Sequence, residues 1–189
     1  ATTNTHFYFP YNLARDSVSN TLYIADTYNH RVMRYFAGAA AGDRVAGDTT
    51  PGIGATQLYM PMGICYDAAS NSLIIANYQV NNVVRWVIGA SVWTLVAGSP
   101  IGTPGFSSIL LHQPTDIAFD SFGNLYVVDL NNNRVQLFLA GQLNGTTIAG
   151  MSTGSGSTQL LSPYALLLDK DLNLYVADTG NHRVQKFNR

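Results

Sequence analysis

The residues best suited to chemistry in this sequence are repeated pairs of aspartate and arginine. Three copies of one motif hold an aspartate, an asparagine three residues later and an arginine two residues after that: Asp26, Asn29 and Arg31; Asp129, Asn132 and Arg134; Asp178, Asn181 and Arg183. Such a carboxylate can accept N–H groups of a tight turn and pair with the guanidinium. Because a single active site does not need three copies, we interpret these residues, with His30 and His182 in the same motif, as structural.

Outside this motif, the candidate metal ligands are His6, His112 and Asp116. Zinc takes three or four convergent ligands, so two histidines and one acid are barely sufficient. The sequence therefore predicts no metal site and no cofactor. The single cysteine, Cys65, follows Met-Gly-Ile in an apolar run without a basic neighbour, so we expect a buried small side chain rather than a reactive thiol.

The motif belongs to a repeat of about fifty residues that spans one domain, residues 1–189. Residues 22–32 return at 125–135 and 174–184, with a weaker copy at 73–83 in which Asn77, Val80 and Asn82 replace the aspartate, asparagine and arginine. A proline opens each unit, and the units are expected at 10–60, 61–113, 114–162 and 163–189. The second unit should keep its shape with a less tightly bonded turn.

Each unit is predicted to be all-β. Short β-branched and aromatic runs bounded by turn residues indicate strands, near 11–15, 22–26, 31–37 and 43–47 in the first unit. No window shows sustained helical periodicity. Four antiparallel strands repeated at this period are typical of the blades of a β-propeller.

The motif Asp-x-x-Asn-His-Arg-Val after Leu-Tyr-Val-Ala resembles the signature of NHL repeats, in register over essentially the whole chain. The resemblance implies a propeller, generally of six blades. The fourth unit lacks a counterpart of the outer strand. Two alternatives follow: the four repeats are part of a larger ring, or several copies complete one another as a homo-oligomer or filament through the unpaired edge near residues 183–187.

Function is expected where the central channel opens, beside the unit-opening prolines, because those residues differ between units. The candidate binding residues there are His6, Tyr8, Tyr11, Asn12, His112, Asp116 and Tyr164. The alternative is that the aromatic residues simply fill the channel. We predict a non-catalytic binding or scaffold module for a protein, peptide or glycan. The resemblance leaves a second class open, a metal-dependent propeller lyase or hydrolase using His6, His112 and Asp116.

Composition restricts the partners. Ten Lys and Arg residues stand against eleven Asp and Glu residues, with no basic run, which argues against nucleic acid because phosphate neutralisation supplies most non-specific affinity. No stretch approaches the roughly 20 apolar residues of a membrane span. Asn144-Gly145-Thr146 is a candidate glycosylation sequon. Together with the Asn/Thr/Ser-rich composition, it favours an extracellular or cell-surface location over a cytoplasmic one.

Overall fold

The computed structural model describes residues 6–188, and these are built almost wholly of β-strands. Fifteen strands form four antiparallel sheets, each from strands consecutive in the sequence. The helices in the described part are four 3-10 turns of three residues. The predicted all-β fold, a propeller of four blades, is confirmed.

Each blade begins at its opening proline. Blade 1 consists of β1 (Pro10–Arg15), β2 (Leu22–Asp26), β3 (Arg31–Tyr35) and β4 (Asp43–Ala46). Blade 2 consists of β5 (Pro61–Asp67), β6 (Ser72–Asn77), β7 (Asn82–Val87) and β8 (Thr94–Gly98). Blade 3 consists of β9 (Pro114–Phe119), β10 (Leu125–Asp129), β11 (Arg134–Phe138) and β12 (Gly145–Ala149). Blade 4 has three described strands, β13 (Pro163–Leu168), β14 (Leu174–Asp178) and β15 (Arg183–Phe187).

A 3-10 turn joins the second and third strands of every blade. These turns are η1 (Thr27–Asn29), η2 (Tyr78–Val80), η3 (Leu130–Asn132) and η4 (Thr179–Asn181). Each is followed by one residue in the left-handed backbone region: His30, Asn81, Asn133 or His182. The second strand, the 3-10 turn and the third strand together hold the repeated motif, so we call this element the motif turn.

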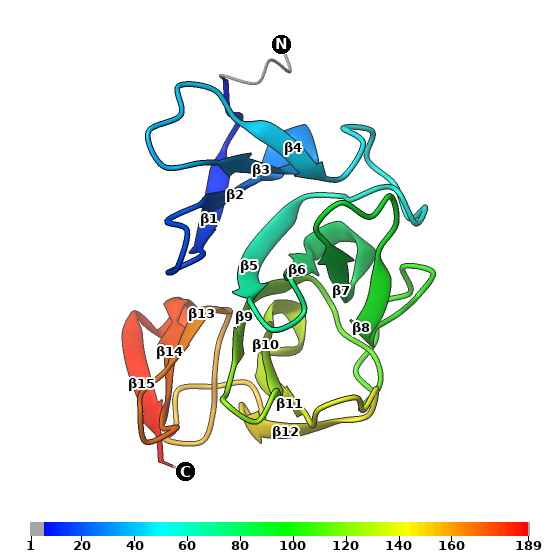
Figure 1. Cartoon of the computed structure of the whole chain (residues 1–189). Helices are drawn as coiled ribbons and strands as arrows, with labels where there is room; N and C mark the ends of the chain where they lie inside the picture. Colours follow the sequence, from blue (N-terminus) through cyan, green and yellow to red (C-terminus); the bar gives the residue numbers. More distant parts are fainter. Residues whose placement is uncertain (1–5, 189) are drawn as a thin grey trace.

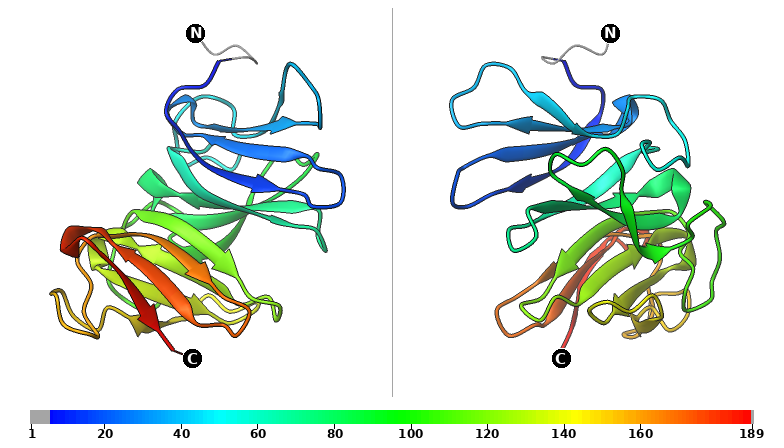
Figure 2. Two further views of the ribbon diagram at one scale, coloured as in Figure 1. Left: turned by 90° about the vertical axis from the view of Figure 1, so that its left-hand side faces the viewer. Right: turned by 45° about the vertical axis from the view of Figure 1, so that its right-hand side comes forward.

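The four blades follow one another around an arc, with their first strands innermost (Figure 1). β1 packs beside β5, β5 beside β9, and β9 beside β13. The views in Figure 2 show blade 4, in orange and red, across the centre from blade 1, in blue. All four opening prolines therefore start strands at the same central axis.

The core consists of three apolar clusters, one between each pair of successive blades. The side chains alternate along each strand, so one face of a blade packs on its predecessor and the other on its successor. The motif valine lies on the successor-facing side. It is fully buried in the first three blades, at Val32, Val83 and Val135.

The outer faces of the first and last blades are different. Val184, the motif valine of blade 4, is 70% exposed, and Leu167, on the same face of the blade two strands away, is 65% exposed. On blade 1, Leu13 is 63% exposed, whereas its counterparts Ile64 and Ile117 are buried. Both ends of the arc thus present an apolar blade face to solvent.

The Ala-Gly pairs that end the fourth strands have a steric reason. Gly150 lies at φ +77°, and a Cβ there would stand 2.1 Å from the carbonyl oxygen of Asn133 in the motif turn. Gly47 and Gly98 make the same close approach to their own motif turns. Glycine is needed because no larger residue fits against the turn backbone.

Candidate binding site at the mouth of the central funnel

The motif turn of blade 3 is a closed network around one buried carboxylate. Asp129 accepts hydrogen bonds from the His112 amide at 2.6 Å, from Asn132 Nδ2 at 2.8 Å and from Arg134 Nε at 2.8 Å. The rest of the guanidinium donates to three backbone carbonyls, those of Phe106, Ser107 and Leu110. The arginine thereby ties the motif turn to the connection that precedes the blade.

Blades 1 and 4 repeat this network. Asp26 binds Asn29 and Arg31, and Asp178 binds Asn181 and Arg183, with Arg Nε–Asp Oδ2 distances of 2.7 Å in both. Asp26 accepts the Tyr8 amide and Asp178 the Leu161 amide. The hydrogen-bond donors to these carboxylates lie in their own motif turn or in the segment before the opening proline, which supports the structural interpretation of the nine motif residues.

Blade 2 forms the same turn with neutral side chains. Asn77 Oδ1 accepts the Tyr59 amide at 2.7 Å, and Asn82 Nδ2 donates to the Ser99 carbonyl at 2.9 Å. Asn77 Nδ2 and Asn82 Oδ1 are buried without a hydrogen-bond partner among the described residues. This turn is indeed less completely bonded, as its sequence predicted.

A tryptophan replaces the missing arginine of blade 2. Trp93 Nε1 donates to the carbonyls of Gly54 and Gln57, both at 3.1 Å. These carbonyls lie five and two residues before Tyr59, the spacing at which Arg134 binds Ser107 and Leu110 ahead of His112. The motif does not predict this role of Trp93, because the residue comes from the loop between β7 and β8.

At the axis, a pocket of about 230 Å³ opens between blades 1, 2 and 4. Its aromatic lining residues are Phe9, Tyr11, Tyr28, Tyr78 and Tyr164. The remaining lining residues are Pro10, Thr27, Met60 and Met62. We call this the funnel pocket. None of its lining residues carries a charge.

The tyrosine rings of the funnel pocket come from different blades. Tyr11 and Tyr164 are equivalent positions in blades 1 and 4, and their ring centroids lie 5.8 Å apart. Tyr28 packs against Phe9 at 5.1 Å. The Tyr78 hydroxyl donates to Gln113 Oε1 at 2.9 Å, which fixes its ring. The pocket walls are therefore held by contacts among the aromatic residues and with their neighbours.

One residue further along the inner strands, a buried carboxylate lies beside the pocket. Asp116 Oδ1 accepts a hydrogen bond from Asn12 Nδ2 at 3.4 Å, and Oδ2 accepts the Leu166 amide at 3.0 Å. The strands are close here, because a Cβ on Gly63 would stand 2.6 Å from the Asp116 Cα. Asp116 forms no ion pair with any described residue.

The surroundings of Asp116 and Tyr11 favour the neutral forms of both side chains. Burial raises the pKa of Asp116, although the amides of Leu166 and Ile117 oppose that shift. Burial, then the neighbouring hydroxyl of Tyr164 and the charge of Asp116, raise the pKa of Tyr11. The electrostatic character of this site is a buried carboxyl group without a basic partner among the described residues, next to an aromatic pocket.

The other predicted binding residues lie at the rim or away from it. Tyr8 packs edge-on against Tyr28 at 5.4 Å, and His112 lies beside Asn131 with 3.4 Å between Nε2 and Nδ2. His6 lies at the motif turn of blade 1, where its carbonyl accepts Arg31 Nη2. No group of three His, Cys, Asp or Glu side chains in residues 6–188 could hold a metal ion, so His6, His112 and Asp116 are not brought together.

Several residues that line the funnel pocket are not among the predicted binding residues. Tyr28 and Tyr78 occupy the variable positions between the first residue of the motif, Asp26 or Asn77, and the 3-10 turn's last residue. The signal was available, since the motif turn and the proline connection meet: the Tyr28 amide donates to the Tyr8 carbonyl and the Tyr78 amide to the Met60 carbonyl. In every blade, the two residues that follow the motif aspartate (Asn77 in blade 2) should therefore lie at the funnel.

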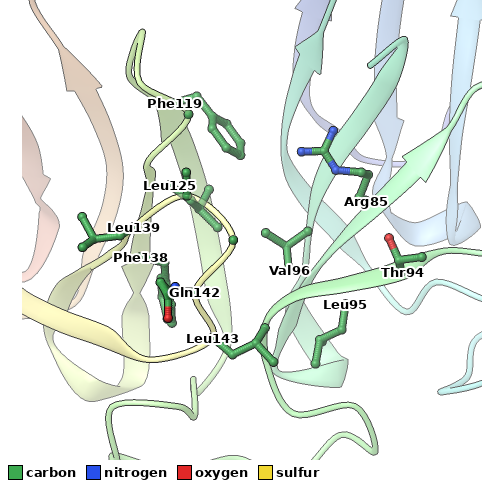
Figure 3. Close-up of a pocket in the computed structure, with 13 residues that line it drawn as sticks. Arg85, Thr94, Leu95, Val96, Phe119, Leu125, Phe138, Leu139, Gln142 and Leu143 are labelled. Atoms are coloured by element: carbon green, nitrogen blue, oxygen red, sulfur yellow. The ribbon is translucent and has the colours of Figure 1, made fainter. Parts of the chain in front are cut away.

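A second pocket, of about 190 Å³, lies between blades 2 and 3, away from the opening prolines. Figure 3 shows Leu95 and Val96 of β8 on one side and Phe119, Leu125 and Phe138 of blade 3 on the other. Arg85 at its border is engaged with Asp67 at 2.7 Å. This pocket is a gap in the apolar packing between blades.

Two residues singled out in the sequence lie apart from these sites. Burial, with the charge of Asp116 as the smaller cause, raises the pKa of the Cys65 thiol to about 12, and Cys65 Sγ lies 3.3 Å from the Ile117 carbonyl oxygen. Asn144 is exposed between β11 and β12.

Among the described residues there is no helix long and apolar enough to cross a membrane.

A family model described as NHL repeat matches residues 111–138 and 165–187. The chain is a β-propeller with NHL repeats in blades 3 and 4. The two matched segments cover the first three strands of blade 3 and most of blade 4, so the resemblance seen in the motif is confirmed. A comparison with curated proteins finds no match.

Solved structures share the fold at low identity. A gluconolactonase from Xanthomonas campestris matches with a TM-score of 0.75 and 16% identity over 98% of this chain and 60% of its own. An auxiliary nutrient-binding protein from Bacteroides ovatus matches with a TM-score of 0.71 and 17% identity over 96% and 48%. A nidogen/laminin complex matches with a TM-score of 0.71 and 18% identity over 96% and 60%. This NHL-repeat chain spans about half to three fifths of their length.

Proposed function

We propose that this NHL-repeat chain is a non-catalytic binding module that holds a protein, peptide or glycan at the funnel pocket. The proposal is carried by one observation: side chains at equivalent inner positions differ between blades, although the backbone repeats. Equivalent inner positions hold Tyr11, Met62, Thr115 and Tyr164, while the motif turns nearby stay nearly uniform. Side chains that differ on a regular scaffold are typical of recognition surfaces.

The chemistry of the pocket supports binding. Tyrosines supply large, rigid contact area with a polar tip at small entropic cost. Solved neighbours named for nutrient binding or for a complex with laminin agree with a binding role. The gluconolactonase neighbour keeps a metal-dependent hydrolase or lyase as the second candidate.

The test compares two tyrosines on the same face. Binding of labelled protein to glycan and peptide arrays should be lost in Tyr164→Ala, because Tyr164 lines the pocket. It should be retained in Tyr59→Ala, whose ring packs on His30 outside the pocket. Hits that survive Tyr164→Ala would contradict the proposal. Metal-dependent turnover of a lactone that is lost in His112→Ala would favour the enzyme instead.

We also propose that copies of the chain associate through the apolar outer faces of blades 1 and 4. Exposed patches of this kind favour association, and the faces correspond to those that pack together inside the chain. Light scattering should show a mass that rises with concentration and falls in Val184→Asp. A constant monomer mass would contradict this.

An extracellular or cell-surface location is proposed from the exposed sequon at Asn144. Asn144 is exposed in the loop between β11 and β12, so its side chain is accessible for glycosylation. Mass spectrometry of protein from its natural source should find Asn144 modified. Unmodified Asn144 would remove the support for this location.

A further inference from the structure

We infer that the funnel pocket recognises a methylated ammonium group, held against the tyrosine rings beside the carboxylate of Asp116. This inference rests on the proposed binding function and names the chemical class of the ligand. Three features of the pocket carry it: the size of the pocket, the polarity of its walls and the charge next to it.

The size favours a small head group over a whole ligand. Pockets that enclose drug-sized molecules have roughly 300–1,000 Å³, whereas the funnel pocket has about 230 Å³. It opens to solvent at the exposed rings of Phe9 and Tyr28. A compact group can therefore enter while the remainder of a peptide or other ligand stays outside.

The walls offer mostly ring surface, and two of their five hydroxyl groups are engaged by neighbours. The Tyr78 hydroxyl already donates to Gln113, and Thr27 Oγ1 donates to the Pro61 carbonyl at 2.7 Å. Met60 and Met62 add polarisable sulfur. A quaternary ammonium needs no hydrogen-bonding partner, because it is attracted by the negative faces of aromatic rings.

The nearby charge selects a cation over a neutral apolar group. Asp116 is 8% exposed and has no basic partner among the described residues. Asn12, which binds its Oδ1, is the chain neighbour of the pocket residue Tyr11. The charge of Asp116 also contributes to the raised pKa of Tyr11, after burial and Tyr164, so its field reaches the pocket wall. A buried carboxylate without a counter-charge is stabilised when a cation approaches.

The experiment titrates the intact chain with choline and with its neutral carbon isostere, 3,3-dimethylbutan-1-ol, following tyrosine fluorescence and calorimetry. Choline should bind roughly tenfold more tightly than the isostere. Asp116→Asn keeps an oxygen that can accept the Leu166 amide but removes the charge. It should weaken choline several-fold and leave the isostere unchanged.

Tyr164→Ala should abolish choline binding, Tyr164→Phe should retain it, and Tyr59→Ala should leave it unchanged. Circular dichroism and thermal unfolding establish that each variant is folded. Equal affinities for choline and the isostere, or no choline binding up to about 10 mM, would overturn the cation inference. If choline does not bind but array hits are still lost in Tyr164→Ala, only the cation inference is wrong and the proposed binding function is supported. If the array hits persist in Tyr164→Ala, the proposed binding function is contradicted whatever the result with choline.

Discussion

Blades 2 and 3 build the same motif turn from different chemistry. In blade 3 the turn closes around the buried pair Asp129 and Arg134. In blade 2 the corresponding residues are Asn77 and Asn82, and the indole of Trp93 reaches the carbonyls that the arginine would bind. Yet the residue after each 3-10 turn has nearly the same backbone angles, φ 57° at Asn81 and φ 53° at Asn133.

The difference shows what the turn requires. Its shape depends on a side-chain oxygen that accepts the incoming amide and on a donor for the carbonyls of the preceding connection. A charge is one way to provide these and not the only way. A catalytic role would require specific charged groups, so the neutral copy in blade 2 favours a structural role for all four turns.

The largest expected effect tests the charged turn. Arg134→Ala leaves Asp129 buried without its ion-pair partner and removes the donor to three carbonyls. Loss of one partner of a buried pair costs about 3–5 kcal/mol, so the free energy of unfolding measured with urea should fall by that amount. Arg183→Ala, at a more exposed pair, should cost about 1–3 kcal/mol.

The control for Arg134→Ala is ligand binding by the folded fraction, which should not change at permissive temperature. A folded variant that no longer binds at the funnel pocket would overturn the structural assignment. Unchanged stability would show that the ion pair does not hold the turn.

A smaller effect is expected from the neutral turn. Trp93→Phe keeps most of the ring packing but removes the indole donor to Gly54 and Gln57. Because these carbonyls are partly solvent-accessible, the expected loss is about 1 kcal/mol, read from the urea midpoint. Adding Asn77→Asp and Asn82→Arg to this variant supplies the guanidinium of the other blades and should recover the loss. An unchanged midpoint in Trp93→Phe would mean that Trp93 only fills space.

The fold could be predicted from sequence because its signals are local and repeated. The strand runs, the opening prolines and the Asp-x-x-Asn-x-Arg spacing all lie within one unit. Because four units repeat in register, the fold of blade 2 can be predicted even though its copy of the motif is weak. Even the less complete bonding of that turn could be expected from Asn77 and Asn82.

The site could be predicted only in part, because it depends on contacts between units. Tyr11 and Tyr164 were predicted from their place beside the prolines, and the structure brings their rings together. The contact of Tyr78 with Gln113 and those of Trp93 with Gly54 and Gln57 depend on the path of connections that do not repeat. His6 is predicted at the funnel because it lies shortly before an opening proline, but in the structure its carbonyl oxygen accepts a hydrogen bond from Arg31. Periodicity determines where backbones go and says little about where unrepeated side chains meet.

The smallest expected effect concerns the residue that links one blade to the next. His30 Nδ1 accepts the Met60 amide at 3.2 Å, as Asn81 Oδ1 accepts the Gln113 amide and Asn133 Oδ1 the Ser162 amide. Only the histidine titrates, and burial lowers its pKa. The unfolded chain therefore takes up a proton first as the pH falls through about 6.5, so His30 stabilises the fold above that pH and loses this contribution below it.

His30→Asn should keep the hydrogen bond and remove this part of the pH dependence. Urea unfolding at pH 7.5 and pH 5 should show a smaller loss of stability in His30→Asn than in the wild type. All other titratable groups are common to the two proteins, so the difference between their pH profiles isolates His30. His182→Asn is the matched control, since no described amide is bonded to its ring, and it should follow the wild type. Identical pH profiles for His30→Asn and the wild type would show that histidine and asparagine are equivalent links at this position even in acid.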